Sequence, residues 1–274
     1  MPSVEDVELR QLAVAAADGD RHALSQVVAA IRDDVYRLAL RMLWDPADAE
    51  EATQEALIRV ITRIGSYRGE AAFSTWVYRV AANHILNWRQ SRTERESLTF
   101  RRFGEQLHEG LTEPDARSPE DDLLAAEVKL GCTLGMLLCL DRDHRLAYVL
   151  SDVFELSSED GAWICGISAE ALRKRASRAR HRLREFTAAH CGLVDRANAC
   201  RCDRRVTAAL ESGRVRRGEL LFAGDIDADA AVAEMEQLHD LSSLMRNHPE
   251  YRTPDRVAAA VQSVIDSGRF AILE

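Results

Sequence analysis

The stretch LSSEDGAWICGIS (156–168), continued by AEALRKRASRARHRLRE (169–185), has the pattern of a short helix, a tight turn and a second helix. Gly166 suits the turn, and Ser168 is a favourable N-cap for the helix that follows. Small and apolar positions then recur at steps of four, three and four, which predicts one buried face: Leu172, Ala176, Ala179 and Leu183. The sequence therefore predicts a helix-turn-helix.

The rest of this second helix is strongly basic. It contains a single acid, Glu170. Against this acid stand seven cations: Arg173, Lys174, Arg175, Arg178, Arg180, Arg182 and Arg184. A helix this basic in a chain of net charge −9 indicates a local phosphate-binding surface. A basic amphipathic helix can also be only a solvated face or a partner-binding helix, and the helix alone leaves these alternatives open.

Composition predicts an all-α protein of about two domains in 274 residues. Hydrophobic residues make up 46% and charged residues 30%, with few aromatics, which favours helices and real cores. The N-terminus lacks the pattern of a secretion signal, and the most apolar stretch, 130–140, is too short to cross a bilayer. We therefore expect a cytoplasmic protein that does not act on a membrane.

Changes in periodicity divide the chain into four parts. Residues 9–92 have helical periodicity throughout, and Asp45 with Pro46 marks a helix start. Residues 93–117 are charged and rich in breakers, so we expect an extended linker there. Ser118 opens a second helical domain at 118–187. The extension at 188–274 contains a cysteine cluster and two predicted amphipathic helices, near 228–246 and 254–267.

Three segments resemble the sigma-70 family of bacterial RNA polymerase subunits, in the order and spacing of its extracytoplasmic-function (ECF) group. DPADAEEATQEAL (45–57) looks like the conserved helix of region two, and FSTWVYRVAAN (73–83) resembles the promoter-melting helix after it. Residues 145–152 and 156–185 look like region four. The resemblance covers just over half of the chain. It implies two helical domains, a region-two bundle and a region-four helix-turn-helix, followed here by a helical extension.

The resemblance also implies roles for particular residues. Those that would bind the polymerase core are Asp48, Glu51, Gln54 and Glu55, and their positions opposite the apolar face of the helix agree with this. Those that would contact the minus-ten promoter element are Arg79, Asn83, His84, Asn87 and Arg89. In the recognition helix, Glu170, Arg173, Lys174 and Ser177 would face bases of the minus-thirty-five element, with Arg178 and Arg180 on phosphates.

The sequence departs from the family pattern at three places. Asn87 stands where an Asp is commoner, Asp141 replaces a common Pro, and 159–164 read EDGAWI where the family usually has an aromatic-x-Glu-Ile-Ala pattern. Trp76 and Trp88 could stack on unpaired bases, but the spacing of Trp76 from Phe73 predicts a core residue.

A cysteine cluster in the extension leaves three interpretations open. Four side chains that could bind zinc fall within thirteen residues: His190, Cys191, Cys200 and Cys202. Their number equals the four ligands of a structural zinc site. A thiol redox switch or inert thiols are the alternatives. The other three cysteines, Cys132, Cys139 and Cys165, fall in apolar helices and are predicted to be core residues. No cofactor is expected unless this cluster binds zinc.

No phosphate-binding glycine loop, metalloprotease His pair or nucleophile elbow occurs in the sequence, so we expect a protein without catalytic activity. The first hypothesis is a sigma factor, whose partners are RNA polymerase core, promoter DNA and either an anti-sigma factor or its own C-terminal extension. The alternative is a stand-alone helix-turn-helix regulator with a metal- or redox-sensing tail. The helices at 45–57 and 73–83 favour the first, because a simple repressor has no reason to carry them.

Overall fold

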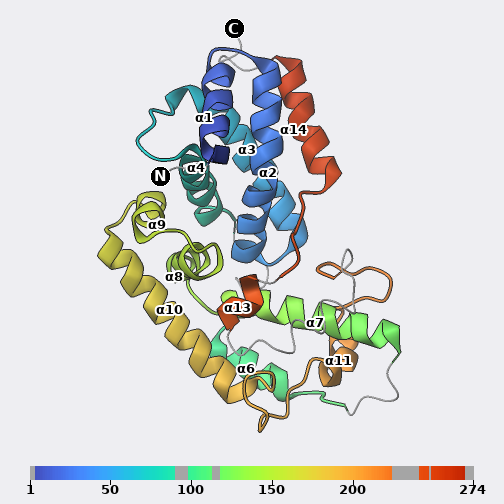
Figure 1. Ribbon diagram of the computed structural model, residues 1–274. Helices are drawn as coiled ribbons and strands as arrows, with labels where there is room; N and C mark the ends of the chain where they lie inside the picture. Colours follow the sequence, from blue (N-terminus) through green and yellow to red (C-terminus); the bar gives the residue numbers. More distant parts are fainter. Residues whose placement is uncertain (1–3, 90–97, 113–117, 224–240, 247, 269–274) are drawn as a thin grey trace. The chain divides into compact units, whose positions relative to one another are not determined.

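The computed structural model describes residues 4–89, 98–112, 118–223, 241–246 and 248–268 (Figure 1). Within these ranges the regular elements are helices, and the only strand-like pairing is an isolated bridge between Arg216 and Glu219. The all-α prediction is confirmed. The chain forms two compact units, residues 1–91 with 156–173 and 251–274, and residues 92–155 with 174–250. These units do not follow the predicted domain boundaries, since the helix-turn-helix segment is divided between them.

The first unit is built on helices α1 (Val4–Ala17), α2 (Arg21–Leu43), α3 (Pro46–Arg63) and α4 (Phe73–Leu86). The Asp45 side chain accepts hydrogen bonds from the backbone N–H groups of Ala47 and Asp48, so the predicted start of α3 is confirmed. A 3-10 turn, Ile64–Ser66, ends this helix. The predicted inward residues of α4 are buried: Phe73, Val77, Val80 and Ile85. Trp76 is only half buried, because its ring lies at the edge of this cluster, stacked on Phe73 at 5.5 Å.

Helices α9 (Ser158–Cys165) and α14 (Asp255–Ser267) complete the first unit. Helix α14 packs along α2 and α3 and buries Val257, Val261 and Ile265 at four-residue steps. It ends at Gly268, which adopts the left-handed conformation that glycine favours. Just before the helix, the Thr253 backbone N–H donates to Asp33 Oδ1 at 2.9 Å. The helix predicted near 228–246 lies largely outside the described residues, apart from α13 (Leu241–Arg246).

The second unit contains α6 (Phe100–His108), α7 (Pro119–Leu137), α8 (Arg142–Tyr148), a π-helical turn (Val149–Val153), most of α10 (Ala169–His190), the turn Asp203–Arg205, and α11 (Val206–Glu211). Helix α6 corrects the prediction of an extended linker. Thr99 caps it, and Phe103 stacks on Phe186 of α10 at 5.6 Å. This stabilisation depends on a residue far along the chain, which the local pattern of charges and breakers does not reveal.

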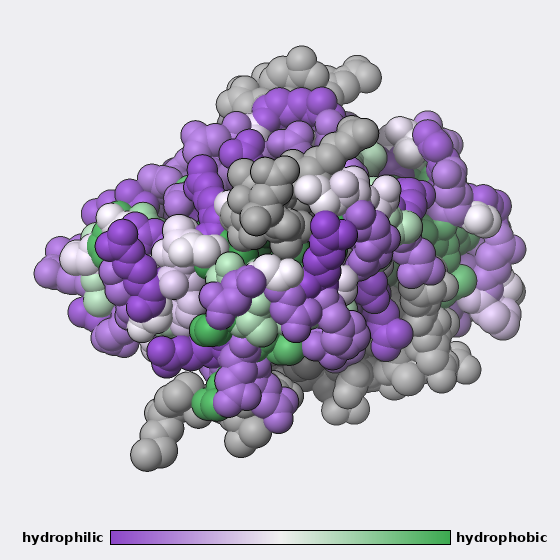
Figure 2. All heavy atoms as spheres, turned by 90° about the horizontal axis from the view of Figure 1, so that it is seen from above, coloured by the Kyte–Doolittle hydropathy of each residue, from purple (hydrophilic) through white to green (hydrophobic). Residues whose placement is uncertain are grey.

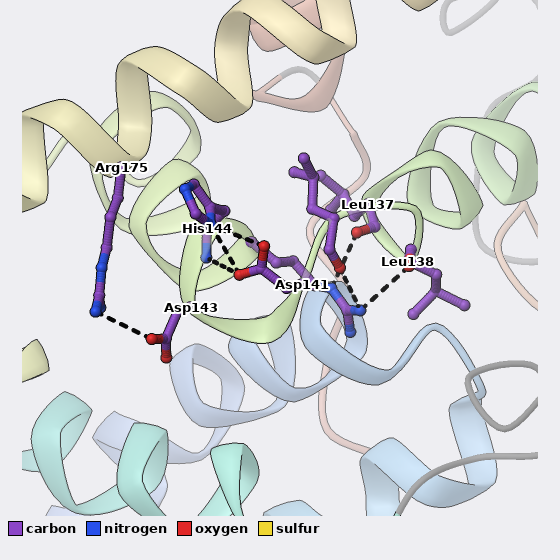
Figure 3. Close-up of polar contacts among 8 residues, drawn as sticks. Leu137, Leu138, Asp141, Asp143, His144 and Arg175 are labelled. Carbon is purple, nitrogen blue, oxygen red and sulfur yellow. Dashed lines mark hydrogen bonds and ion pairs between the residues drawn. The ribbon is translucent and has the colours of Figure 1, made fainter. Parts of the chain in front are cut away.

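Polar side chains fix both ends of α7. Ser118, which the sequence predicts to open this helix, forms a capping box with Asp121. At the other end the buried guanidinium of Arg145 donates to the carbonyl oxygens of Leu137, Leu138 and Leu140 at 3.0, 3.4 and 3.0 Å (Figure 3). Arg145 thus ties α8 to α7 and adds donors to the carbonyl groups at the helix end.

The extension packs on the middle of α7. The carboxylate of Glu127, which is 1% exposed, accepts the backbone N–H groups of Leu221, Phe222 and Ala223 at 2.9, 2.9 and 2.7 Å.

Among the described residues, no helix is long and apolar enough to span a membrane. Figure 2 shows hydrophilic side chains over most of the visible face, with only small hydrophobic spots.

Candidate nucleic-acid interface

The polar residues of α3 form an acidic ridge, which we define as Asp48, Glu51 and Glu55. Glu51 and Glu55 are exposed, while Ala49, Ala52 and Ala56 on the opposite face are buried. The outward orientation predicted for Glu51 and Glu55 is therefore present, whereas Asp48 is half buried. Gln54, the fourth predicted core-binding residue, is half buried.

A groove of about 520 Å³ runs between α3 and α4 beside this ridge. Both sets of predicted site residues line it: Glu51 and Glu55 from α3, and Asn83, His84, Asn87 and Arg89 from α4 and its end. The Arg89 guanidinium lies 2.5 Å from Glu51 Oε2 and 3.3 Å from Asp48 Oδ1. Two surfaces predicted for different partners are therefore joined by ion pairs.

His84 lies on the same groove, with its Nε2 atom 3.5 Å from Glu55 Oε2. Burial and the nearby Arg59 lower the pKa of His84, and the opposing pull of Glu55 is the smallest effect. The imidazole is therefore neutral at physiological pH, and its side chain is only 8% exposed. Asn87 closes α4 by donating its side-chain N–H to the Asn83 carbonyl at 2.7 Å, so an Asn here has a structural role.

Arg79 is separated from the other minus-ten candidates. It lines a second pocket of about 340 Å³ together with Tyr67, Trp76 and Trp163. Its guanidinium carbon lies 4.4 Å from the centre of the Trp163 ring, in cation–π geometry. The structure thus brings together four of the five predicted minus-ten residues and places Arg79 against α9.

The predicted turn between α9 and α10 forms as expected. Gly166 adopts the left-handed conformation with φ of 65°, and Ser168 Oγ accepts the Ala171 backbone N–H at 3.2 Å. Gly161 also has a clear role, because a Cβ atom there would lie 2.7 Å from Leu172 Cδ2. The departure from the family pattern at Gly161 therefore allows α9 and the start of α10 to pack closely.

Several basic residues of α10 are exposed, and two form ion pairs with acids outside this helix. The face of α10 predicted to point inward is buried. Most of the residues predicted to contact the minus-thirty-five element are exposed: Glu170, Arg173, Lys174, Ser177 and Arg178. Arg180 differs, because it donates from Nε and Nη2 to the buried carboxylate of Asp152 at 2.6 and 3.0 Å. Its predicted phosphate contact would require breaking this pair, so we assign Arg180 a structural role. Arg175 pairs with Asp143 at 3.0 Å (Figure 3).

Comparison with known proteins shows which family this chain resembles. The Sigma-70 region 2 family matches residues 27–95, which contain most of α2 and all of α3 and α4. The ECF RNA polymerase sigma factor SigE of Mycolicibacterium smegmatis is 32% identical over 184 residues, covering 65% of this chain and 68% of that protein. SigW of Bacillus subtilis, also an ECF sigma factor, is 31% identical and covers 61% of this chain and 90% of that protein.

The chain belongs to the ECF RNA polymerase sigma factors. The solved structure of CnrH in complex with the cytosolic domain of CnrY is also similar, with a TM-score of 0.46 and 21% identity, over 66% of this chain and 98% of that one. The groove between α3 and α4 therefore lies inside the segment that matches region 2 of this ECF sigma factor.

In this chain, the neighbours of His190 and of the clustered cysteines differ from those in the predicted zinc-ligand set. His190 Nδ1 lies 3.0 Å from His108 Nε2, and the His190 ring packs on Phe186. Cys132 of α7, predicted to be a plain core residue, lies within electrostatic reach of the thiols of Cys191, Cys200 and Cys202.

The thiols of this cluster are free. Burial, with a smaller contribution from Cys191, raises the pKa of Cys200 to about 11 and that of Cys202 to about 12. Within the described ranges, no set of three His, Cys, Asp or Glu side chains is arranged to hold a metal ion. The zinc alternative thus gains no geometric support and stays a prediction.

Proposed function

We propose that this chain is the promoter-specificity subunit of a bacterial RNA polymerase. Its α3 ridge would bind the polymerase core, its α4 groove would bind and open the minus-ten element, and α10 would read the minus-thirty-five element in the major groove. The observation that carries the proposal is the shared groove, where the acids of α3 and the amides and cations of α4 lie side by side. The related proteins, which are named RNA polymerase sigma factors, support the same function.

Arg89 would couple the two binding events. In the free chain its guanidinium neutralises Asp48 and Glu51, so it is held away from DNA. A polymerase surface that binds these acids would release Arg89 to a promoter phosphate, because exposed ion pairs are weak and exchange readily. We therefore expect a chain of net charge −9 to bind promoter DNA weakly by itself and more tightly with the polymerase.

The extension would act as an internal partner of the region-2 bundle. Helix α14 covers the flank of α3 next to Glu50, where Arg256 donates to both carboxylate oxygens at 2.5 and 2.6 Å. The ridge itself stays open beside this flank. We therefore propose that α14 supports the fold and flanks the polymerase-binding surface without covering it. The protein would act in the cytoplasm, where RNA polymerase works.

Binding to purified core polymerase tests the proposal. The double variant Glu51→Gln and Glu55→Gln removes two charges of the ridge, and Glu211→Gln, an exposed acid of α11, is the matched control. We expect the double variant to weaken core binding at least tenfold, measured by fluorescence anisotropy of the labelled full chain, and the control to bind as the wild type does. Equal binding by all three proteins would refute the assignment of the ridge.

A further inference from the structure

Helix α9 is held against α4 in the first unit by two side-chain contacts. The Trp163 ring covers the Arg79 guanidinium at 4.4 Å, and Thr75 Oγ1 donates to Asp160 Oδ1 at 3.4 Å. Thr75 is 6% exposed and Asp160 is half buried, so the second contact is partly shielded from water. Both contacts join the first helix of the helix-turn-helix to the helix that the proposed function places on promoter DNA.

Trp163 does not serve the core of the helix-turn-helix. Its neighbours Ala162 and Ile164 are buried, whereas the Trp163 ring is half buried and lies over Arg79. A large aromatic side chain left outside the core can instead contribute a cation–π contact. It stands in the EDGAWI stretch, where this sequence departs from the family pattern.

Trp163 and a DNA strand would compete for the same cation. The Arg79 guanidinium lies over the Trp163 ring, and a base that stacked on this guanidinium from the same side would compete with the indole. The pocket of about 340 Å³ beside it is lined by Tyr67, Trp76 and Arg79 together with Trp163 itself. A strand that reached Arg79 along these aromatic rings would therefore compete with Trp163 for the cation.

We propose that Trp163 is an intramolecular mask for Arg79, which lowers promoter binding until DNA or the polymerase moves α9 off α4. This inference rests on the proposed function, with Arg79 contacting the promoter as the family resemblance implies. Removing the mask should favour promoter complexes by about two- to fivefold, the factor that corresponds to a partly exposed cation–π contact.

The test is in vitro transcription by the full chain with purified bacterial core polymerase, on a promoter selected from genomic fragments. Trp163→Leu keeps an apolar side chain without a π face, and Trp163→Phe keeps a ring. We expect W163L to raise transcript yield about two- to fivefold at limiting chain concentration, and W163F to stay near the wild type. In an Arg79→Ala background, W163L should have no further effect.

Thr75→Val provides an independent variant that leaves α9 unchanged. It removes the donor to Asp160 and should raise the yield in the same direction, even if W163L lowers the thermal stability of the helix-turn-helix. If R79A reduces transcription but neither W163L nor T75V increases it, the mask is refuted and the proposed function stands. If no protein directs specific transcripts, the proposed function fails and the mask falls with it.

Discussion

Substitution of Val261 by Ala tests whether α14 is an integral part of the region-2 bundle. Val261 is 0% exposed, and its neighbours Val257 and Ile265 on the same face are also buried. The change removes two carbon atoms, each contributing about 0.8 kcal/mol of burial, and leaves a cavity. We expect the free energy of unfolding to fall by roughly 1.5–3 kcal/mol.

Urea unfolding followed by circular dichroism measures this change, and hydrogen exchange locates it. The urea midpoint should fall by about 1 M, since m-values of small proteins are about 1–3 kcal/mol per M. Exchange should accelerate in α14 and in the facing parts of α2 and α3. Ser263→Ala, an exposed position of the same helix, is the matched control and should change stability by less than about 0.5 kcal/mol. An unchanged midpoint in V261A, together with fast exchange of α14 in the wild type, would refute the packing of the extension on region 2.

Four further predictions follow from single contacts. Glu127→Gln replaces one carboxylate oxygen with a donor, so it should cost roughly 1–3 kcal/mol of stability and accelerate exchange of the 221–223 amides. Arg145→Met removes the buried side-chain donor to three carbonyls at the end of α7 and should cost roughly 2–4 kcal/mol of stability in the same urea assay. Burial raises the pKa of Cys200 to about 11, so its neutral thiol stabilises the fold below pH 9 and this contribution is lost as pH rises through 11. In urea titrations from pH 8 to 11, the free energy of unfolding should therefore fall less for Cys200→Ala than for the wild type. Arg178→Ala removes an exposed cation predicted to contact a phosphate, so it should reduce the salt dependence of promoter binding by about one unit of log K against log salt, uniformly across promoter sequences.

Local signals in the sequence predicted most helix boundaries. Asp45 before Pro46 and the Ser118–Asp121 pair act through neighbouring backbone groups, so the sequence alone reveals them. The buried face of α10 follows from residue spacing within one helix. The exposed ridge of α3 was predictable for the same reason.

Contacts between distant segments could not be predicted. The sequence of α6 predicts a linker, because its contact between Phe103 and Phe186 joins distant segments. The sequence of α10 likewise predicts that Arg180 binds phosphate, whereas the structure pairs it with Asp152. A run of arginines does not indicate which one will find a buried acid, because that depends on how another helix packs. The stack of Trp163 on Arg79 is a contact of the same kind.

In vitro transcription with the triple variant Glu51→Ala, Gln54→Ala and Glu55→Ala tests the central claim most directly. Purified core polymerase, the full chain and genomic fragments are combined, and the transcript starts are sequenced. We predict discrete start sites with the wild-type chain, absent with core alone and lost with the triple variant. If the wild-type chain bound duplex DNA without the polymerase and produced no new starts, a stand-alone regulator would explain the helix-turn-helix and the sigma-factor function would be contradicted.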